Sequence, residues 1–102
     1  MKELIGSEKQ IRWAEDIRRN AMEHYANEIA EFDETIAEAV EDDDREWADG
    51  ITKKRDLVVE MYEKLESASS AGWWIDMRGR DLVGEYKLFK KFGRGAFTLL
   101  DK

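Results

Sequence analysis

The sequence contains no cysteine and no proline, and it has one histidine in 102 residues. Without cysteine, neither a disulfide framework nor a thiolate metal site is possible. Without proline, helices are not interrupted by the residue that breaks them most strongly. No apolar run approaches the roughly 18 residues that a membrane-spanning helix needs, and the first six residues lack the apolar region of a secretory signal. We therefore expect a cytoplasmic protein that does not contact membranes.

The residues that carry catalysis are equally scarce. A catalytic site needs a positioned nucleophile, base or metal, and His24 offers one imidazole with Glu28 four residues later. Two ligands on one helix make a poor zinc site, so a solvated surface histidine is the simpler interpretation. The run Asp42, Asp43 and Asp44 lacks the alternating ligands and central glycine of a calcium-binding loop. The sequence predicts that the protein is not an enzyme and holds neither cofactor nor metal.

Charge is abundant and unevenly distributed. Charged residues make up 40% of the chain, and the net charge is −7. Residues 23–50 carry twelve acidic side chains and one basic one, whereas residues 67–102 carry seven basic and four acidic ones. The length is that of one domain, and the eleven aromatic residues are typical of a folded chain. The polarity between an acidic middle and a mildly basic end concerns binding partners more than the fold.

The acidic middle has the periodicity of a helix. At the helical angle per residue, seven large apolar side chains share an arc of about 80°. Nine of the twelve acids lie on a separate arc of about 140°. The apolar set is Met22, Tyr25, Ile29, Phe32, Ile36, Val40 and Trp47. These two stripes predict a long amphipathic helix with one acidic face.

The sequence predicts the two ends of this helix less clearly than its faces. Ser7 and Gln10 have the spacing of a capping box, which predicts the start. An unbroken helix over residues 7–49 would be about 60 Å long. The rest of a domain of this size is too small to pack against the apolar face of such a helix along its whole length. We expect a kink or break near Asn20, near Asn27 or within residues 42–44. The alternative is a long helix that projects or dimerises.

The rest of the chain reads as shorter elements. Residues 49–50 predict a helix stop at Gly50, after which Thr52 caps a second helix. Residues 67–70 form a loop, and Ser70 caps a short segment over residues 71–78. Alternating apolar residues and the turn at 93–95 favour a short β-hairpin at the end, although Val83 and Tyr86 also suit a helix.

These elements predict a mainly α fold with one domain over residues 1–102. Residues 7–66 are helical, residues 67–70 are a loop, and residues 71–102 are a mixed segment. The expected architecture is a helical hairpin or small bundle, built on the long acidic helix and ending in the β-hairpin.

The acidic stripe is the first candidate binding surface. Twelve acids over residues 23–50 would be spaced about 3.5 Å apart on a helix, close to the roughly 3.4 Å between phosphates along one DNA strand. The stripe is therefore either a nucleic-acid mimic or a solvated face that keeps the protein soluble. The high concentration of like charge favours the mimic, because solubility does not require such self-repulsion. The predicted phosphate surrogates are Glu31, Glu34, Glu38, Glu41, Asp42 and Glu46.

A second candidate lies near the C-terminus, where basic and aromatic residues are interleaved. Such a combination can clamp phosphates and stack bases. The alternative is that the aromatics complete a small core while the cations neutralise the acidic helix. The predicted nucleic-acid contacts are Lys87, Lys90, Lys91 and Arg94.

The adjacent pair Trp73 and Trp74 is the third candidate. Neighbouring side chains diverge, so one indole can be buried while the other stays near the surface. An exposed tryptophan is a frequent hot spot of protein interfaces. Packing in the core or as a loop anchor is the default interpretation of the pair, and an apolar anchor for a partner is the alternative.

Two segments carry a resemblance. Residues 6–18, GSEKQIRWAEDIR, resemble a recurrent opening of small proteins of bacterial phages and mobile elements, and residues 71–78, AGWWIDMR, are similar to a later aromatic motif of those proteins. The two motifs cover about a fifth of the chain. The resemblance brings no catalytic residues. It implies a phage or mobile-element protein acting in a bacterial host cell, a setting that includes anti-CRISPR inhibitors.

Charge and resemblance together set the functional expectation. The leading hypothesis is an anti-CRISPR protein whose acidic helix occupies the basic nucleic-acid groove of a Cas nuclease. The alternatives are a nucleic-acid-binding accessory protein that uses the basic aromatic end, and an adaptor whose helices form a homodimer.

Overall fold

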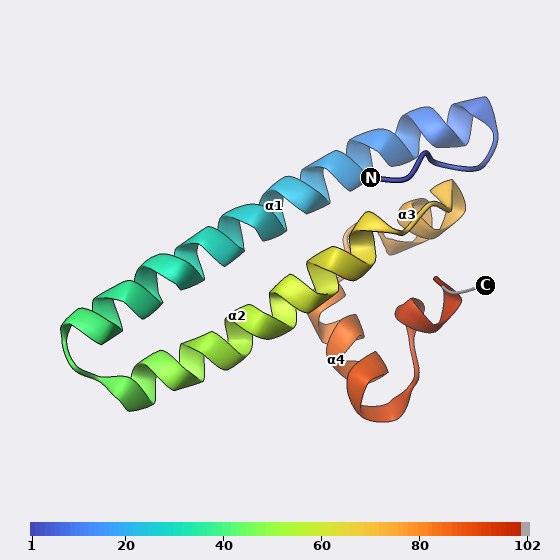
Figure 1. Ribbon diagram of the computed structural model, residues 1–102. Coiled ribbons are helices and arrows are strands. Elements are labelled where there is room, and N and C mark those ends of the chain that lie inside the picture. The colour runs from blue at the N-terminus through green and yellow to red at the C-terminus, as the bar shows by residue number, and fades with distance from the viewer. Residues whose placement is uncertain (101–102) are drawn as a thin grey trace.

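The computed structural model describes residues 1–100, which form four α-helices and one short 3-10 helix (Figure 1). Helix α1 spans Glu8–Glu41 and begins at the predicted capping box. The Ser7 hydroxyl accepts a hydrogen bond from the Gln10 backbone at 3.2 Å, and the Gln10 amide oxygen accepts one from the Ser7 backbone at 3.1 Å. Because both exposed N–H groups are satisfied, the helix start is fixed locally. The prediction of a mainly α fold is confirmed.

The long helix ends in the triple aspartate, one of the three places where a break was expected. Helix α1 continues through Asn20 and Asn27. Asp43 then adopts a left-handed backbone with φ of 55°, a conformation that aspartate tolerates better than most residues. Asp44 caps the next helix by accepting a hydrogen bond from the Trp47 backbone at 3.0 Å. The three aspartates therefore form the turn of a helical hairpin.

Helix α2, Arg45–Glu66, runs through Gly50, so the predicted stop there is wrong. Its cap is Asp44 rather than Thr52, whose hydroxyl donates to the Ala48 carbonyl at 2.7 Å inside the helix. Ala48 and Ile51 flank the glycine and are buried. Packing of these neighbours against α1 outweighs the low helix propensity of one glycine, which is about 1 kcal/mol relative to alanine.

Gly50 offers a test of this account. Replacing Gly50 with alanine should raise the free energy of unfolding by about 1 kcal/mol, because the new methyl group meets nothing within 4 Å. Gly93→Ala is the matched control, since its methyl group also meets nothing but its backbone has φ of +64°. That variant should lose about 1–2 kcal/mol. Urea denaturation followed by circular dichroism measures both, and equal effects of the two substitutions would contradict the argument.

The two short helices pack at one end of the hairpin. Helix α3, Ala71–Met77, is capped by Ser70 as predicted, with the hydroxyl accepting from the Trp73 backbone at 3.1 Å. It packs against α1, while helix α4, Leu82–Phe92, contacts α2. The N-terminal strand-like segment joins this end through a parallel bridge between Ile5 and Ser70.

The predicted C-terminal β-hairpin is wrong, because this segment is helical. Asp81 caps α4 and Gly93 ends it with a left-handed backbone. The 3-10 helix η1, Ala96–Leu99, then returns along α4. Its Phe97 is fully buried, and its ring centroid lies 5.0 Å from that of Tyr86. The contact between Tyr86 and Phe97 stabilises the helical conformation of α4, which is why this segment does not form a strand.

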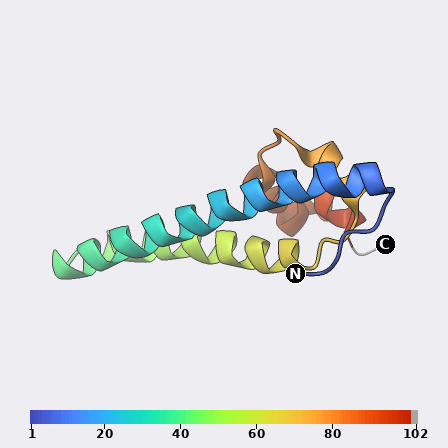
Figure 2. The same cartoon turned by 90° about the horizontal axis from the view of Figure 1, so that it is seen from above.

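The hydrophobic core lies at the end of the hairpin that carries α3, α4 and η1. Its largest fully buried side chains are Trp74, Phe97, Met61 and Leu65. The molecule measures 52 × 28 × 21 Å, and both views show the other half of the hairpin extending beyond the short helices (Figures 1 and 2). We call this half, residues 29–57, the arm and its end, residues 38–49, the tip. In the arm, only Ala39, Ala48 and Ile51 are buried.

Two buried tyrosines make the stability of this core depend on pH. Burial is the main cause that raises the pKa of Tyr86 from 10.0 to about 12, and the charge of Glu60 is the second. Burial also raises the pKa of Tyr25. A tyrosine whose pKa is higher in the folded state than in the unfolded state binds its proton more tightly when the protein is folded. The free energy of unfolding therefore falls as the pH rises from the lower of these pKa values to the higher.

The free energy of unfolding should therefore fall between pH 10 and about pH 12 because of Tyr86. Tyr86→Phe should remove that part of the fall, since phenylalanine does not titrate. Urea denaturation at a series of alkaline pH values tests this, with Tyr62→Phe as the control at a half-buried position. A fall of the same depth in the wild type and in Tyr86→Phe would contradict the prediction.

Candidate functional site

The six predicted phosphate surrogates all lie on the arm. The structure places Glu31, Glu34, Glu38 and Glu41 on α1, Asp42 at its C-cap and Glu46 in the first turn of α2. All six side chains are exposed. Among residues 1–100, none of their carboxylates forms an ion pair or a side-chain hydrogen bond. Their charge is therefore available to a partner.

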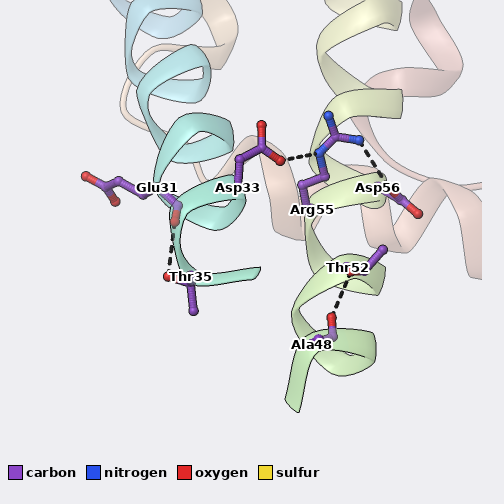
Figure 3. A network of polar contacts seen from close by, with 7 residues as sticks. All are labelled: Glu31, Asp33, Thr35, Ala48, Thr52, Arg55 and Asp56. Carbon is purple, nitrogen blue, oxygen red and sulfur yellow. Dashed lines mark hydrogen bonds and ion pairs between the residues drawn. The ribbon is translucent and has the colours of Figure 1, made fainter. Parts of the chain in front are cut away.

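Asp33, which lies between Glu31 and Glu34 in the sequence, differs from these six acids because it has a partner within the protein. Asp33 points toward α2, where its carboxylate lies 2.9 Å from Arg55 Nε, while Glu31 points away from α2 (Figure 3). Arg55 also reaches Asp56 at 3.3 Å. This contact joins the two helices of the arm and uses the one acid that faces inward. Within residues 1–100, and apart from Asp44, whose side chain caps α2, the other acids of the acidic middle on the arm make no ion pair or side-chain hydrogen bond between its two helices.

The turn changes the shape of the acidic surface. The prediction of one continuous stripe over residues 23–50 is wrong, because the chain reverses at residues 42–44 and returns as α2. Seven of the twelve acids remain on about 27 Å of α1. The others gather at the tip, where Glu46 and Asp49 lie on the second helix. The acidic surface is a stripe on α1 that widens into a cluster at the tip.

The tip also carries apolar side chains that the sequence pattern assigned to the buried stripe. Val40 is 64% exposed and Trp47 is 53% exposed. They follow the helical phase of the core residues but lie beyond the reach of α3 and α4. A recess beside them is lined by Asp44, Glu46 and Trp47. Sequence reasoning missed these two residues because periodicity shows which face is apolar and not whether a neighbour covers it.

Trp73 and Trp74 both pack in the core, which confirms the default interpretation of the pair, and the alternative of a surface anchor is wrong. Trp73 is 5% exposed and Trp74 is fully buried. The Trp73 indole N–H donates to the Ala96 carbonyl at 2.9 Å, and that of Trp74 donates to the Ala68 carbonyl at 3.0 Å. The two rings meet edge to face, α3 packs against α1, and the Trp73 ring contacts that of Phe97 in η1. Both tryptophans therefore belong to the core.

The basic set lies on and after α4, with all four cations exposed. Lys90 is engaged within the protein, since its Nζ lies 2.7 Å from the Glu60 carboxylate. Lys91 lies over the ring of Phe92, 5.5 Å from its centroid. Lys87 and Arg94 extend to solvent. Of the interleaved aromatic side chains, Tyr86 and Phe97 are buried and Phe89 is half-buried, so Phe92 alone is left as an exposed stacking surface.

His24 and Glu28, the two side chains considered as metal ligands, lie side by side on α1. His24 lies 3.6 Å from Glu28 on the exposed side of α1, and residues 1–100 contain no group of three or more ligating side chains that would hold a metal ion. No helix in this part of the chain is both long and apolar enough for a membrane span. A recess of about 640 Å³ between α1 and residues 77–82 includes His24, Arg78 and Arg80. Its lining includes Trp74 of the predicted aromatic pair, but none of the predicted phosphate surrogates or basic nucleic-acid contacts.

The chain matches no protein-family model, no curated protein and no solved structure.

Proposed function

We propose that this protein is a small inhibitor that binds the basic nucleic-acid groove of a CRISPR-Cas nuclease with its acidic arm. The observation that carries the proposal is the set of six exposed carboxylates without internal partners, on an arm in which Ala39, Ala48 and Ile51 alone are buried. Because like charges repel, this concentration destabilises the isolated protein. A positively charged groove would relieve that repulsion and release the ions that accompany both surfaces.

The arm has a form suited to such a groove. It is a pair of helices that projects from the core (Figures 1 and 2), and a pair of helices is about as wide as a DNA duplex, roughly 20 Å. The exposed acids of α1 follow this rod at an average spacing of about 5 Å, wider than the roughly 3.4 Å between phosphates of one DNA strand. By occupying the channel that holds the guide–target duplex, the arm would exclude DNA.

The resemblance of residues 6–18 and 71–78 to phage and mobile-element proteins fits this proposal. In the structure, the two segments lie together, since the Arg78 guanidinium lies 4.7 Å from the ring centroid of Trp13 and α3 packs on α1. They form the core end of the molecule. The shared motifs would therefore maintain the scaffold, while the arm carries the contact with the target.

The test is a DNA-cleavage assay with guide-loaded Cas9 and added protein. We expect inhibition that is relieved by raising the salt concentration, because the contact consists largely of ion pairs. Adding the protein before target DNA should inhibit, whereas adding it after DNA binding should have little effect. Cleavage unaffected at any protein concentration would overturn the proposal. A gel shift with DNA and RNA separates the alternative, since direct binding lost on mutating Lys87, Lys91 and Arg94 indicates an accessory nucleic-acid-binding protein.

A further inference from the structure

Two apolar side chains at the tip, Val40 and Trp47, keep more than half of their surface exposed. Val40 is 64% exposed and Trp47 is 53% exposed. Within residues 1–100, the Trp47 indole has no ring contact, no cation over its face and no partner for its N–H. Trp13 is exposed to a similar degree, 49%, but the Arg78 guanidinium lies 4.7 Å from its ring centroid. Trp47 is thus the uncovered indole of the described chain.

The surroundings of Trp47 define what can cover it. Seven acids and one arginine lie within the tip, which gives this segment a net charge of −6. A second tip, an anionic membrane or a nucleic acid would be repelled. A protein surface rich in Lys and Arg is complementary, provided that it also offers an apolar or aromatic pocket. The acids are Glu38, Glu41, Asp42, Asp43, Asp44, Glu46 and Asp49.

One kind of site has both properties. Grooves that hold single-stranded nucleic acid combine Lys and Arg along the backbone path with aromatic side chains that stack on the bases. The tip presents the same two features in the same relation, a flat bicyclic ring next to anionic oxygens. In the recess at the tip, the indole lies beside Asp44 and Glu46.

We propose that Trp47 acts as a surrogate for an unstacked base, and that the tip docks into the single-strand-binding part of its target's groove. Val40 would broaden the apolar contact from the end of α1. This inference rests on the proposed function and adds a partner site to it. The stripe on α1 supplies charge, whereas the tip supplies the aromatic contact.

The probe is Cas9 loaded with guide RNA, whose groove for the displaced strand is of this kind. Trp47→Ala should weaken binding by about tenfold or more, the range seen when one base-stacking contact is removed. Trp13→Ala, the control with the same side chain at the other end of α1, should stay within about twofold. Val40→Ser is the second tip variant, and circular dichroism confirms that each variant is folded. Single-stranded DNA should compete with the wild type for the nuclease.

A structural readout distinguishes stacking from a general effect. In protein labelled with 5-fluorotryptophan, the ¹⁹F resonance of residue 47, assigned from Trp47→Phe, should shift on binding, and that of residue 13 should not. If the wild type inhibits but Trp47→Ala binds equally well, or the residue 47 resonance stays in place, this inference is overturned and the proposed function stands. If duplex DNA competes while single strands do not, the base surrogate is also excluded. If the wild type neither binds nor inhibits, the proposed function falls and this inference with it.

Discussion

Replacing Trp74 with alanine should lower the free energy of unfolding by about 3–5 kcal/mol, the usual loss when a large aromatic side chain is removed from a core. Trp74 is fully buried, and its ring meets that of Trp73 edge to face at a centroid distance of 5.1 Å. The substitution opens a cavity and removes the donor that satisfies the Ala68 carbonyl. Since small domains are stable by about 5–15 kcal/mol, this variant should lose a large part of its stability.

Two controls make the Trp74 result specific. Trp74→Phe keeps an aromatic ring but loses the indole N–H, so its stability should lie between those of the wild type and the alanine variant. Trp47→Ala removes the same side chain where it is 53% exposed and should cost less than about 1 kcal/mol. Urea denaturation measures all three. Similar losses for Trp74→Ala and Trp47→Ala would show that the core is not organised around the short helix α3.

Reversing four arm acids to lysine should abolish inhibition, raising the concentration needed by at least about a hundredfold. The variant combines Glu34→Lys, Glu38→Lys, Glu41→Lys and Glu46→Lys. Each position is exposed, and glutamate and lysine have similar helix propensities. The fold should therefore persist, while the arm would now repel a basic groove.

The control variant replaces four exposed acids outside the arm with lysine. Glu3, Glu15, Glu66 and Asp76 are exposed and lie outside the arm. Either quadruple variant has a net charge of +1 instead of −7, because every reversal adds two charges. If inhibition depended only on net charge, both variants would fail equally. Retained inhibition in the control and its loss in the arm variant, in a cleavage assay at fixed salt, would locate the contact. Undiminished inhibition by the arm variant would refute the proposed surface.

Some elements were predictable because their signals are local. The capping box at Ser7 and Gln10 and the cap at Ser70 depend on side chains within three residues of each other, and both form. The triple aspartate was one of three expected breaks. It is the one used because Asp43 adopts the left-handed backbone and Asp44 caps the next helix.

Other elements depend on contacts that the sequence pattern does not contain. Gly50 remains helical because Ala48 and Ile51 are buried against α1. The C-terminal segment folds as a helix because Tyr86 meets Phe97, eleven positions away, in an aromatic cluster. The candidate site was predictable in part. The exposed acids follow from periodicity, but the exposure of Trp47 and the burial of Trp73 depend on where the short helices end.

The distribution of buried side chains implies that the molecule does not open uniformly. Amide hydrogens near Met61, Leu65 and Trp74 are held by the core and should exchange with solvent only on global unfolding. Those near Ala39 and Ala48 are protected by two helices that bury few side chains between them, so they should exchange through smaller, local openings. The arm is thus a region of low local stability attached to a firmer base. Its helices would be able to adjust their separation to a target without disturbing the fold that carries them.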